Sequence, residues 1–258
     1  MKSEDKEHNL TDMESLTGKK IFVLYPDEKI RNIFYGQLRN QFAVYYIYDY
    51  EKIRQLAEYY PSSIVVINLV DNELEWLPEE ISSEIEGLSD DARPETIAIY
   101  DKIKPQSEFC SRSIQFLGDD KTLRAELYEI FIQLNGKGRR NFVRLGGSGE
   151  EIALMKITSD AGEYNAIAHD MSSSGLSCSI IQTADISKGE SLTIRLSLEG
   201  KTVELRAEKI LERSFGETII HVLKFSEPMS EDSRTGLLNF IYSSLDSKMH
   251  EFIKNLSI

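Results

Sequence analysis

The sequence predicts two domains of different class: a doubly wound parallel α/β sheet, then a six-stranded antiparallel β-barrel with a C-terminal helix. The 258 residues exceed the roughly 100–150 of a common domain. Short apolar runs alternate with helix-like segments in the first half, whereas the second half holds closely spaced strand-like runs. Residues 1–136 carry 15 basic and 26 acidic side chains, net −11, and residues 137–258 carry 15 and 17, net −2. The two halves therefore differ in both pattern and charge.

The α/β domain is expected at residues 17–135, after a polar, aperiodic segment at 1–16 that reads as a flexible tail. Asp27 should cap the first helix, because its carboxylate can accept from amides that are otherwise unpaired. The amphipathic pattern places the last helix at 121–134. The expected elements are strands at 21–25, 42–48, 63–69, 96–100 and 113–117, with helices at 28–40, 50–60 and 121–134.

A linker is expected at 136–149, where five glycines in residues 135–149 disfavour both helix and strand. The barrel and final helix should occupy 150–258. Gly, Ser and Asp clusters separate the expected strands at 152–158, 164–168, 175–181, 192–198, 203–211 and 218–225. An apolar stripe on the final helix should cover the barrel or a partner helix, with core packing favoured: Leu237, Phe240, Ile241, Leu245, Met249 and Phe252.

Composition excludes several classes of function. A net charge of −13 argues against general nucleic-acid binding. The longest apolar stretches fall far short of the roughly 20 residues that cross a bilayer, and the amino terminus lacks the apolar core of a secretory signal. We therefore expect a cytoplasmic protein without membrane insertion. Cys110 and Cys178 show no metal-type spacing, which predicts buried or incidental thiols and neither a disulfide nor a zinc site.

The run from Ile21 to Arg31, with its βα periodicity, resembles the opening of a response-regulator receiver domain, and the similarity in pattern covers residues 19–135. Receivers hold Mg²⁺ and a phosphoacceptor aspartate at positions that here carry Tyr25-Pro26 and Asn68. The lysine after the last strand is also missing, from Phe116-Leu-Gly-Asp-Asp120. The resemblance thus implies a receiver-like domain that lacks phosphorylation residues, with Asp71 as the alternative acceptor.

Such a domain could serve as a docking or dimerisation surface. An apolar set in the first half is either an exposed patch or, as we favour, part of the core: Tyr59, Tyr60, Trp76, Leu77 and Ile81.

Two motifs carry the candidate chemistry. Arg140 and Arg144 stand four residues apart, with Arg139 adjacent, and Asp170-Met-Ser-Ser-Ser-Gly175 follows. Strand alternation should place Asp170 and Ser172 on one face and Met171 on the other, with Gly175 permitting a tight or left-handed turn. Guanidinium groups can bind guanine O6 and N7 or phosphate oxygens, and a carboxylate can accept from guanine N1–H and N2. These residues therefore favour a planar, anionic guanine nucleotide.

Arg-x-x-x-Arg followed by Asp-x-Ser-x-x-Gly resembles the signature of PilZ domains, receptors for cyclic di-GMP, over residues 137–250. The resemblance implies that Arg140 and Arg144 wrap over the ligand, that Arg139 adds a phosphate or stacking contact, and that Asp170, Ser172 and Gly175 hold the ligand against the barrel. It implies a non-enzymatic effector that needs no cofactor. Because the arginines lie on the linker, ligand binding should change the interdomain arrangement, and we expect a signal to a protein partner through the N-terminal domain or the C-terminal helix.

Three alternatives remain open at this point. The arginines could simply be solvated, with Asp170 capping a turn. The protein could be an interaction adaptor whose PilZ-like fold binds no nucleotide. It could also be a phosphorylation-controlled regulator that uses Asp71. His169 has no accompanying nucleophile and is expected to be structural, and Gly146-Gly-Ser-Gly149 lacks the Walker ending.

Overall fold

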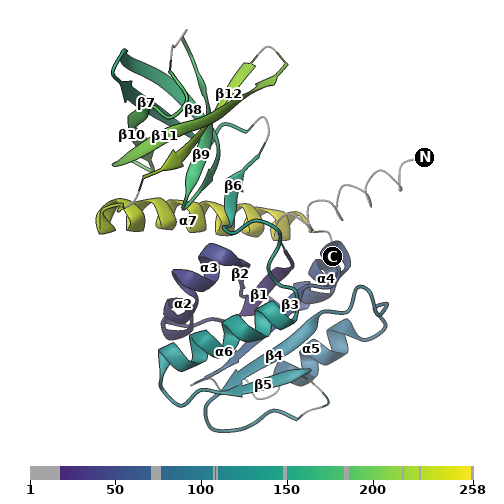
Figure 1. The fold of residues 1–258 in the computed structure, drawn as a ribbon. Helices are drawn as coiled ribbons and strands as arrows, with labels where there is room; N and C mark the ends of the chain where they lie inside the picture. The colour runs from purple at the N-terminus through teal and green to yellow at the C-terminus, as the bar shows by residue number, and fades with distance from the viewer. Residues whose placement is uncertain are drawn as a thin grey trace, which may run out of the picture. The chain divides into compact units, whose positions relative to one another are not determined.

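The computed structural model describes residues 18–70, 77–106, 108, 110–147, 150–182, 186–216, 218–226 and 228–256 (Figure 1). The predicted tail at 1–16, Asp71 and Trp76 lie outside these residues. The chain forms two compact units, one of residues 1–141 with 246–258 and one of residues 142–245. The first is called the α/β unit below and the second the barrel unit. The domain limits expected from composition stay predictions.

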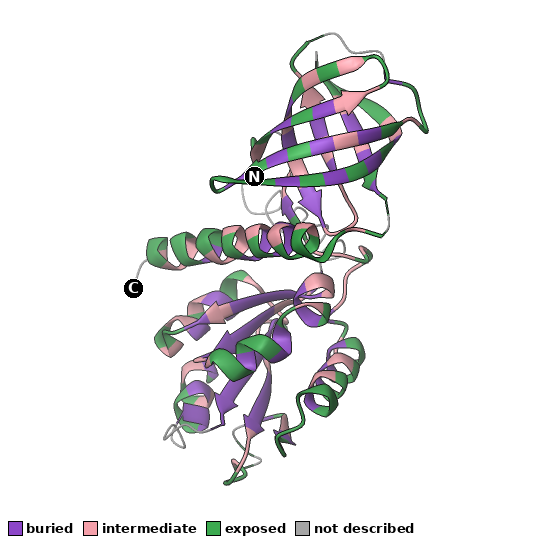
Figure 2. Ribbon diagram, turned by 90° about the vertical axis from the view of Figure 1, so that its left-hand side faces the viewer, coloured by how far each residue is buried: buried purple, intermediate pink, exposed green. Residues whose placement is uncertain are grey.

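The α/β unit is built on a five-stranded parallel sheet of order β2-β1-β3-β4-β5, as the alternating pattern predicts. Residues of β1, β3 and β4 are buried along most of their length, as expected for strands covered on both faces (Figure 2). The strands are β1 Lys20–Leu24, β2 Ala43–Ile47, β3 Ile64–Leu69, β4 Glu95–Tyr100 and β5 Arg112–Gln115.

The helices of this unit agree with the prediction at most positions. The Ile30 amide donates to the Asp27 carboxylate at 2.8 Å, which confirms the predicted cap. A single helix at 28–40 is wrong, because the chain turns extended at Tyr35 and takes φ +81° at Gly36. The helices are α2 Glu28–Phe34, α3 Gln37–Gln41, the 3₁₀ turn η1 Tyr50–Lys52, α4 Ile53–Tyr59, α5 Leu77–Ile85 and α6 Asp120–Gln133.

Helix α5 was not predicted. Leu77 and Ile81 on this helix are fully buried, so for these two residues the core interpretation is right. Tyr59, in contrast, is 47% exposed.

The barrel unit contains six antiparallel strands in the order β8-β7-β10-β11-β12-β9, closed by pairing of β8 with β9. This confirms the predicted six-stranded barrel. A short strand, β6 Arg144–Gly146, was expected to be linker but pairs with the end of β8. The barrel strands are β7 Ala153–Ser159, β8 Gly162–Ser172, β9 Gly175–Ile180, β10 Ser191–Leu198, β11 Lys201–Phe215 and β12 Thr218–Phe225.

Helix α7, Glu231–Asn255, contributes to both units. In the barrel unit, Leu237 and Ile241 are part of the core, as the apolar stripe predicts. In the α/β unit, the ring of Phe252 lies 4.6 Å from that of Tyr59 and 5.7 Å from that of Tyr60, measured between centroids. The last part of α7 is therefore an element of the α/β unit.

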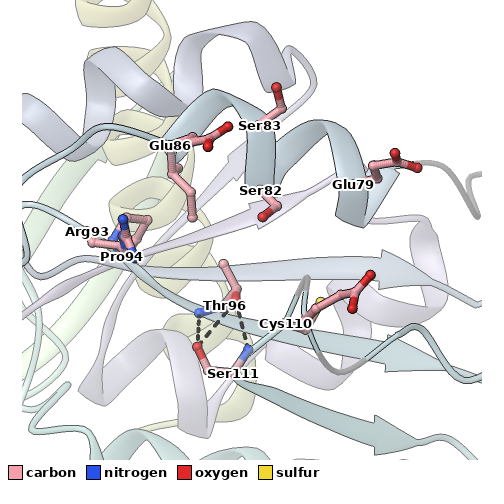
Figure 3. Close-up of a pocket in the computed structure, with 11 residues that line it drawn as sticks. Glu79, Ser82, Ser83, Glu86, Arg93, Pro94, Thr96, Cys110 and Ser111 are labelled. Carbon is pink, nitrogen blue, oxygen red and sulfur yellow. Dashed lines mark hydrogen bonds between the residues drawn. The ribbon is translucent and has the colours of Figure 1, made fainter.

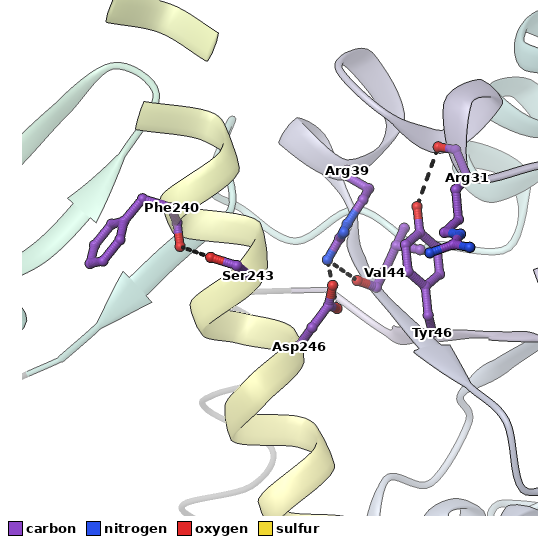
Figure 4. Close-up of polar contacts among 7 residues, drawn as sticks. All are labelled: Arg31, Arg39, Val44, Tyr46, Phe240, Ser243 and Asp246. Atoms are coloured by element: carbon purple, nitrogen blue, oxygen red, sulfur yellow. Dashed lines mark hydrogen bonds and ion pairs between the residues drawn. The ribbon is translucent and has the colours of Figure 1, made fainter. Parts of the chain in front are cut away.

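The same part of α7 makes an ion pair within the α/β unit. The Arg39 guanidinium lies 2.7 Å from the Asp246 carboxylate and donates to the Val44 carbonyl at 3.5 Å (Figure 4). The guanidinium also lies over the Tyr46 ring, 4.6 Å from its centroid. Arg39 is only 6% exposed, whereas the Asp246 side chain is 34% exposed.

In the described part of the chain, every helix is too short or too polar to span a bilayer.

Candidate functional site

Four of the six residues predicted to hold the ligand lie where β6 pairs with the end of β8 and the chain turns into β9. Arg144 lies opposite Ser172, and its Nη1 donates to Asp170 Oδ2 at 2.9 Å, a diagonal cross-strand pair. Leu145 and Met171 oppose each other on the inner face and are fully buried, as alternation predicts for Met171. Arg144 and Asp170 therefore share the outer face, with their side chains 43% and 19% exposed.

A β-bulge sets the direction of Asp170. The β8–β9 register shifts between Ala168 and Asp170, so His169 is the extra residue. The His169 ring contacts the Glu150 carbonyl oxygen through Nδ1 at 2.6 Å and the Ser179 hydroxyl through Nε2 at 2.8 Å. His169 thus has the structural environment expected of it, and the bulge itself was missed because no residue in the pattern marks it.

Ser172 organises the turn between β8 and β9. Its Oγ accepts from the Ser174 amide at 3.3 Å, donates to the Gly175 carbonyl oxygen at 3.2 Å, and lies 3.1 Å from the Ser174 hydroxyl. Ser172 is only 3% exposed, which the alternation did not predict. Its hydroxyl is used to shape the turn beside Asp170.

Gly175 follows a tight turn at Ser173–Ser174, as predicted, but not a left-handed one. It is absent from the glycines with positive φ, so a left-handed turn does not explain it. A Cβ at this position would lie 2.3 Å from the Leu223 carbonyl oxygen on β12. Close approach of two strands therefore requires glycine at the end of the motif.

Arg139 and Arg140 precede this cluster and are grouped with the α/β unit. Arg139 is exposed and Arg140 is half-buried. Lys137, at the start of the predicted linker, donates to the Gln41 side chain at 3.0 Å. Within the barrel unit, the structure therefore brings Arg144, Asp170, Ser172 and Gly175 together, and the contribution of Arg139 and Arg140 to the site stays a prediction.

The position that resembles a receiver phosphoacceptor is occupied by a structural amide. Asn68 is fully buried; its Nδ2 donates to the Tyr25 carbonyl oxygen at 3.1 Å and its Oδ1 accepts from the Val70 amide at 3.1 Å. Both ends of the amide are thus engaged in holding the chain after β1 and β3. Among the described residues, no group of three His, Cys, Asp or Glu side chains could hold a metal ion.

Both cysteines are buried and free, which agrees with the prediction of buried thiols. Burial raises the pKa of Cys110 to about 11 and that of Cys178 to about 12. Neither thiol is therefore activated as a nucleophile.

A pocket of about 700 Å³ lies in the α/β unit and includes none of the predicted ligand-binding residues (Figure 3). Its polar groups include Thr96 and Ser111, whose hydroxyls accept from each other's backbone amides at 3.0 and 3.1 Å. The pair ties β4 to the segment before β5. The pocket is lined by Glu79, Ser82, Ser83, Ile85, Glu86, Arg93, Pro94, Thr96, Glu108, Cys110 and Ser111.

Comparison with known proteins gives a family for the second half. Residues 138–243 match the family model of the PilZ domain. No curated protein matches the chain. Similar solved structures include the Bacillus subtilis inhibitor of motility MotI/DgrA, at 17% identity and a TM-score of 0.35 over 45% of this chain and 52% of that chain. The chain thus spans about half the length of that relative.

Two structures of PilZ domains are also similar over less than half of this chain. The PilZ domain of Escherichia coli YcgR, solved with c-di-GMP, matches at 18% identity and a TM-score of 0.37, over 46% of this chain and 99% of that one. The PilZ domain of CeSA, from a cellulose-synthesizing bacterium, matches at 16% identity and a TM-score of 0.31, over 39% and 96%. On the match to the family model, residues 138–243 of this chain form a PilZ domain.

Proposed function

We propose that this protein is a receptor for cyclic di-GMP that binds the nucleotide on the outer face of the β6–β8 pair. The observation that carries the proposal is the Arg144–Asp170 pair, 2.9 Å apart and partly exposed, within a PilZ domain. The PilZ domain of E. coli YcgR, which matches this chain at 18% identity, was solved with c-di-GMP. The ligand assignment for this chain rests on the two motifs and on the chemistry of this pair.

The pair offers complementary groups to a guanine nucleotide. The Arg144 guanidinium can donate two parallel N–H bonds to guanine O6 and N7 or to phosphate oxygens, and its plane can stack on a purine. The Asp170 carboxylate can accept from guanine N1–H and N2, a pairing that adenine cannot offer. Partly exposed ion pairs contribute only about 0–1 kcal/mol, so exchanging the Arg144–Asp170 contact for ligand contacts costs little.

In this proposal, Arg139 and Arg140 add positive charge to that of Arg144 for binding the anionic nucleotide. They lie on the segment that leads into the barrel unit, and we propose that this segment becomes ordered over the ligand. Ordering costs roughly 1–2 kcal/mol per residue fixed, which several charge-assisted hydrogen bonds would offset. Ligand binding would then bias the placement of the two units and signal to a protein partner, without catalysis.

Isothermal titration with cyclic di-GMP tests this function, with GTP, cyclic GMP and cyclic di-AMP as controls. Saturable binding selective for cyclic di-GMP is expected, and Arg144→Ala or Asp170→Ala should each weaken it at least tenfold. Arg195→Ala is the matched control, because Arg195 donates to Glu204 at 2.9 Å from an exposed position elsewhere on the barrel. Absence of binding by the unmodified protein would refute the proposal and favour the adaptor alternative.

A further inference from the structure

We infer that His169 is a positioning residue for the candidate ligand site: it holds the β-bulge that directs Asp170 toward Arg144 on the outer face of the barrel. His169 belongs to neither sequence motif. The inference rests on the proposed cyclic di-GMP site and adds a residue to the group on which ligand affinity depends.

The burial pattern along β8 shows why the bulge matters. Ala166 and Ala168 are fully buried, so strict alternation would turn Asp170 into the barrel core as well. The next fully buried residue is instead Met171, three positions after Ala168. One extra residue has therefore reversed the phase of the strand, and without it the Asp170 carboxylate would face inward.

The His169 ring anchors the extra residue to two neighbouring segments. A carbonyl oxygen can only accept, so Nδ1 carries the proton in its 2.6 Å contact with Glu150. In the neutral ring, Nε2 then accepts from the Ser179 hydroxyl at 2.8 Å. One imidazole thus connects the bulge in β8 to the segment before β7 and to β9.

The bulge also fits closely against the strand that carries Arg144. Gly146, the last residue of β6, has φ +89°, and a Cβ there would lie 2.4 Å from the His169 carbonyl oxygen. β6 is only three residues long and is paired through Arg144, Leu145 and Gly146. The position of the bulge therefore bears on both members of the Arg144–Asp170 pair.

Two substitutions at the same position separate anchoring of the bulge from general stability. His169→Ala removes both ring contacts, whereas the side-chain amide of His169→Asn can replace Nδ1 as donor to Glu150. Loss of two hydrogen bonds that orient Asp170 should weaken cyclic di-GMP binding about tenfold in His169→Ala. His169→Asn should remain within about threefold of the unmodified protein. His250→Ala, at an exposed position on α7, is the matched control and should bind normally.

Equal affinity of His169→Ala and the unmodified protein would overturn the inference, as would equally weak binding by the Asn and Ala variants. If His169→Ala does not fold, Ser179→Ala removes the Nε2 contact alone and should weaken binding about threefold. Unchanged affinity of Ser179→Ala for cyclic di-GMP would then overturn the inference about His169.

Hydrogen exchange in the absence of ligand distinguishes this inference from the receptor function. His169→Ala should speed exchange of the Asp170, Met171 and Ser172 amides relative to the unmodified protein, whether or not the protein binds nucleotide. Unchanged protection of these amides refutes the role of His169. Failure of the unmodified protein to bind cyclic di-GMP refutes the receptor function alone.

Discussion

Breaking the Arg39–Asp246 ion pair should destabilise the α/β unit. Removing one partner of a buried ion pair costs about 3–5 kcal/mol, mainly because the other charge is left without compensation. Asp246→Ala would remove the carboxylate that lies 2.7 Å from the Arg39 guanidinium, which is 6% exposed and also contacts the Val44 carbonyl at 3.5 Å and the Tyr46 ring. The Asp246 side chain retains some water contact at 34% exposure, so we expect the low end of that range, about 3 kcal/mol.

The pair as a whole should contribute less than either single substitution suggests. Burial raises the pKa of Asp246, and the attraction of Arg39 lowers it by less. The ionised form of Asp246 is therefore less favourable at this site than in water, even with its partner present. Replacing both residues, Arg39→Met with Asp246→Leu, should restore stability to within about 1 kcal/mol of the unmodified protein.

Native-state hydrogen exchange on the full chain measures the loss of stability at the residues around Asp246. A loss of about 3 kcal/mol corresponds to roughly 150-fold faster exchange in residues 246–256 wherever exchange proceeds by local opening. Arg54→Ala is the control, because its pair with Glu58 is exposed and should contribute about 0.5 kcal/mol at most. A cost below about 1 kcal/mol for Asp246→Ala, or a double variant as unstable as the worse single one, would refute the reasoning.

Three further predictions concern single positions. Gly175→Ala should lower the free energy of unfolding of the barrel by about 3 kcal/mol, because the new Cβ would lie 2.3 Å from the Leu223 carbonyl oxygen. Urea unfolding measures this change, and a loss below about 1 kcal/mol would contradict the prediction. Burial lowers the pKa of His221 below its usual 6.5, so the folded state favours the neutral ring. The stability that His221 contributes is therefore present above pH 6.5 and is lost as the pH falls through the lowered pKa. If the melting temperature of His221→Phe has the same pH dependence as that of the unmodified protein, His221 is not the source of this loss. Asn68→Asp should destabilise the α/β unit by about 3 kcal/mol or more at neutral pH, because a buried carboxylate would replace the amide that donates to the Tyr25 carbonyl. An unchanged midpoint of urea unfolding would contradict this prediction.

Periodicity predicted the elements whose apolar faces are regular. The five parallel strands and the six barrel strands follow such patterns, and β12 has the predicted bounds at 218–225. Helix α5 was missed, and the break at Tyr35–Gly36 was missed because the surrounding apolar spacing stays helical. Periodicity describes single segments and carries little information on where a helix is interrupted.

The candidate site was predictable in its residues but not in its geometry. Arg144 and Asp170 could be identified from the two motifs. Their contact, however, depends on β6, and the glycines around β6 led to the prediction of a linker there. The direction of Asp170 depends on the bulge at His169, which arises from tertiary contacts with Glu150 and Ser179. Residues distant in sequence fix such details, and local patterns do not contain them.

The membership of α7 in both units has a consequence for synthesis on the ribosome. The α/β unit is discontinuous in the chain, since residues 142–245 of the barrel unit lie between its main part and its last segment. During translation, the parallel sheet is complete long before Asp246 and Phe252 emerge, and until then Arg39 and Tyr59 lack these partners. The first unit to be translated is therefore the last to be finished, and a nascent chain that stops after residue 245 would carry a complete barrel beside an incomplete α/β unit.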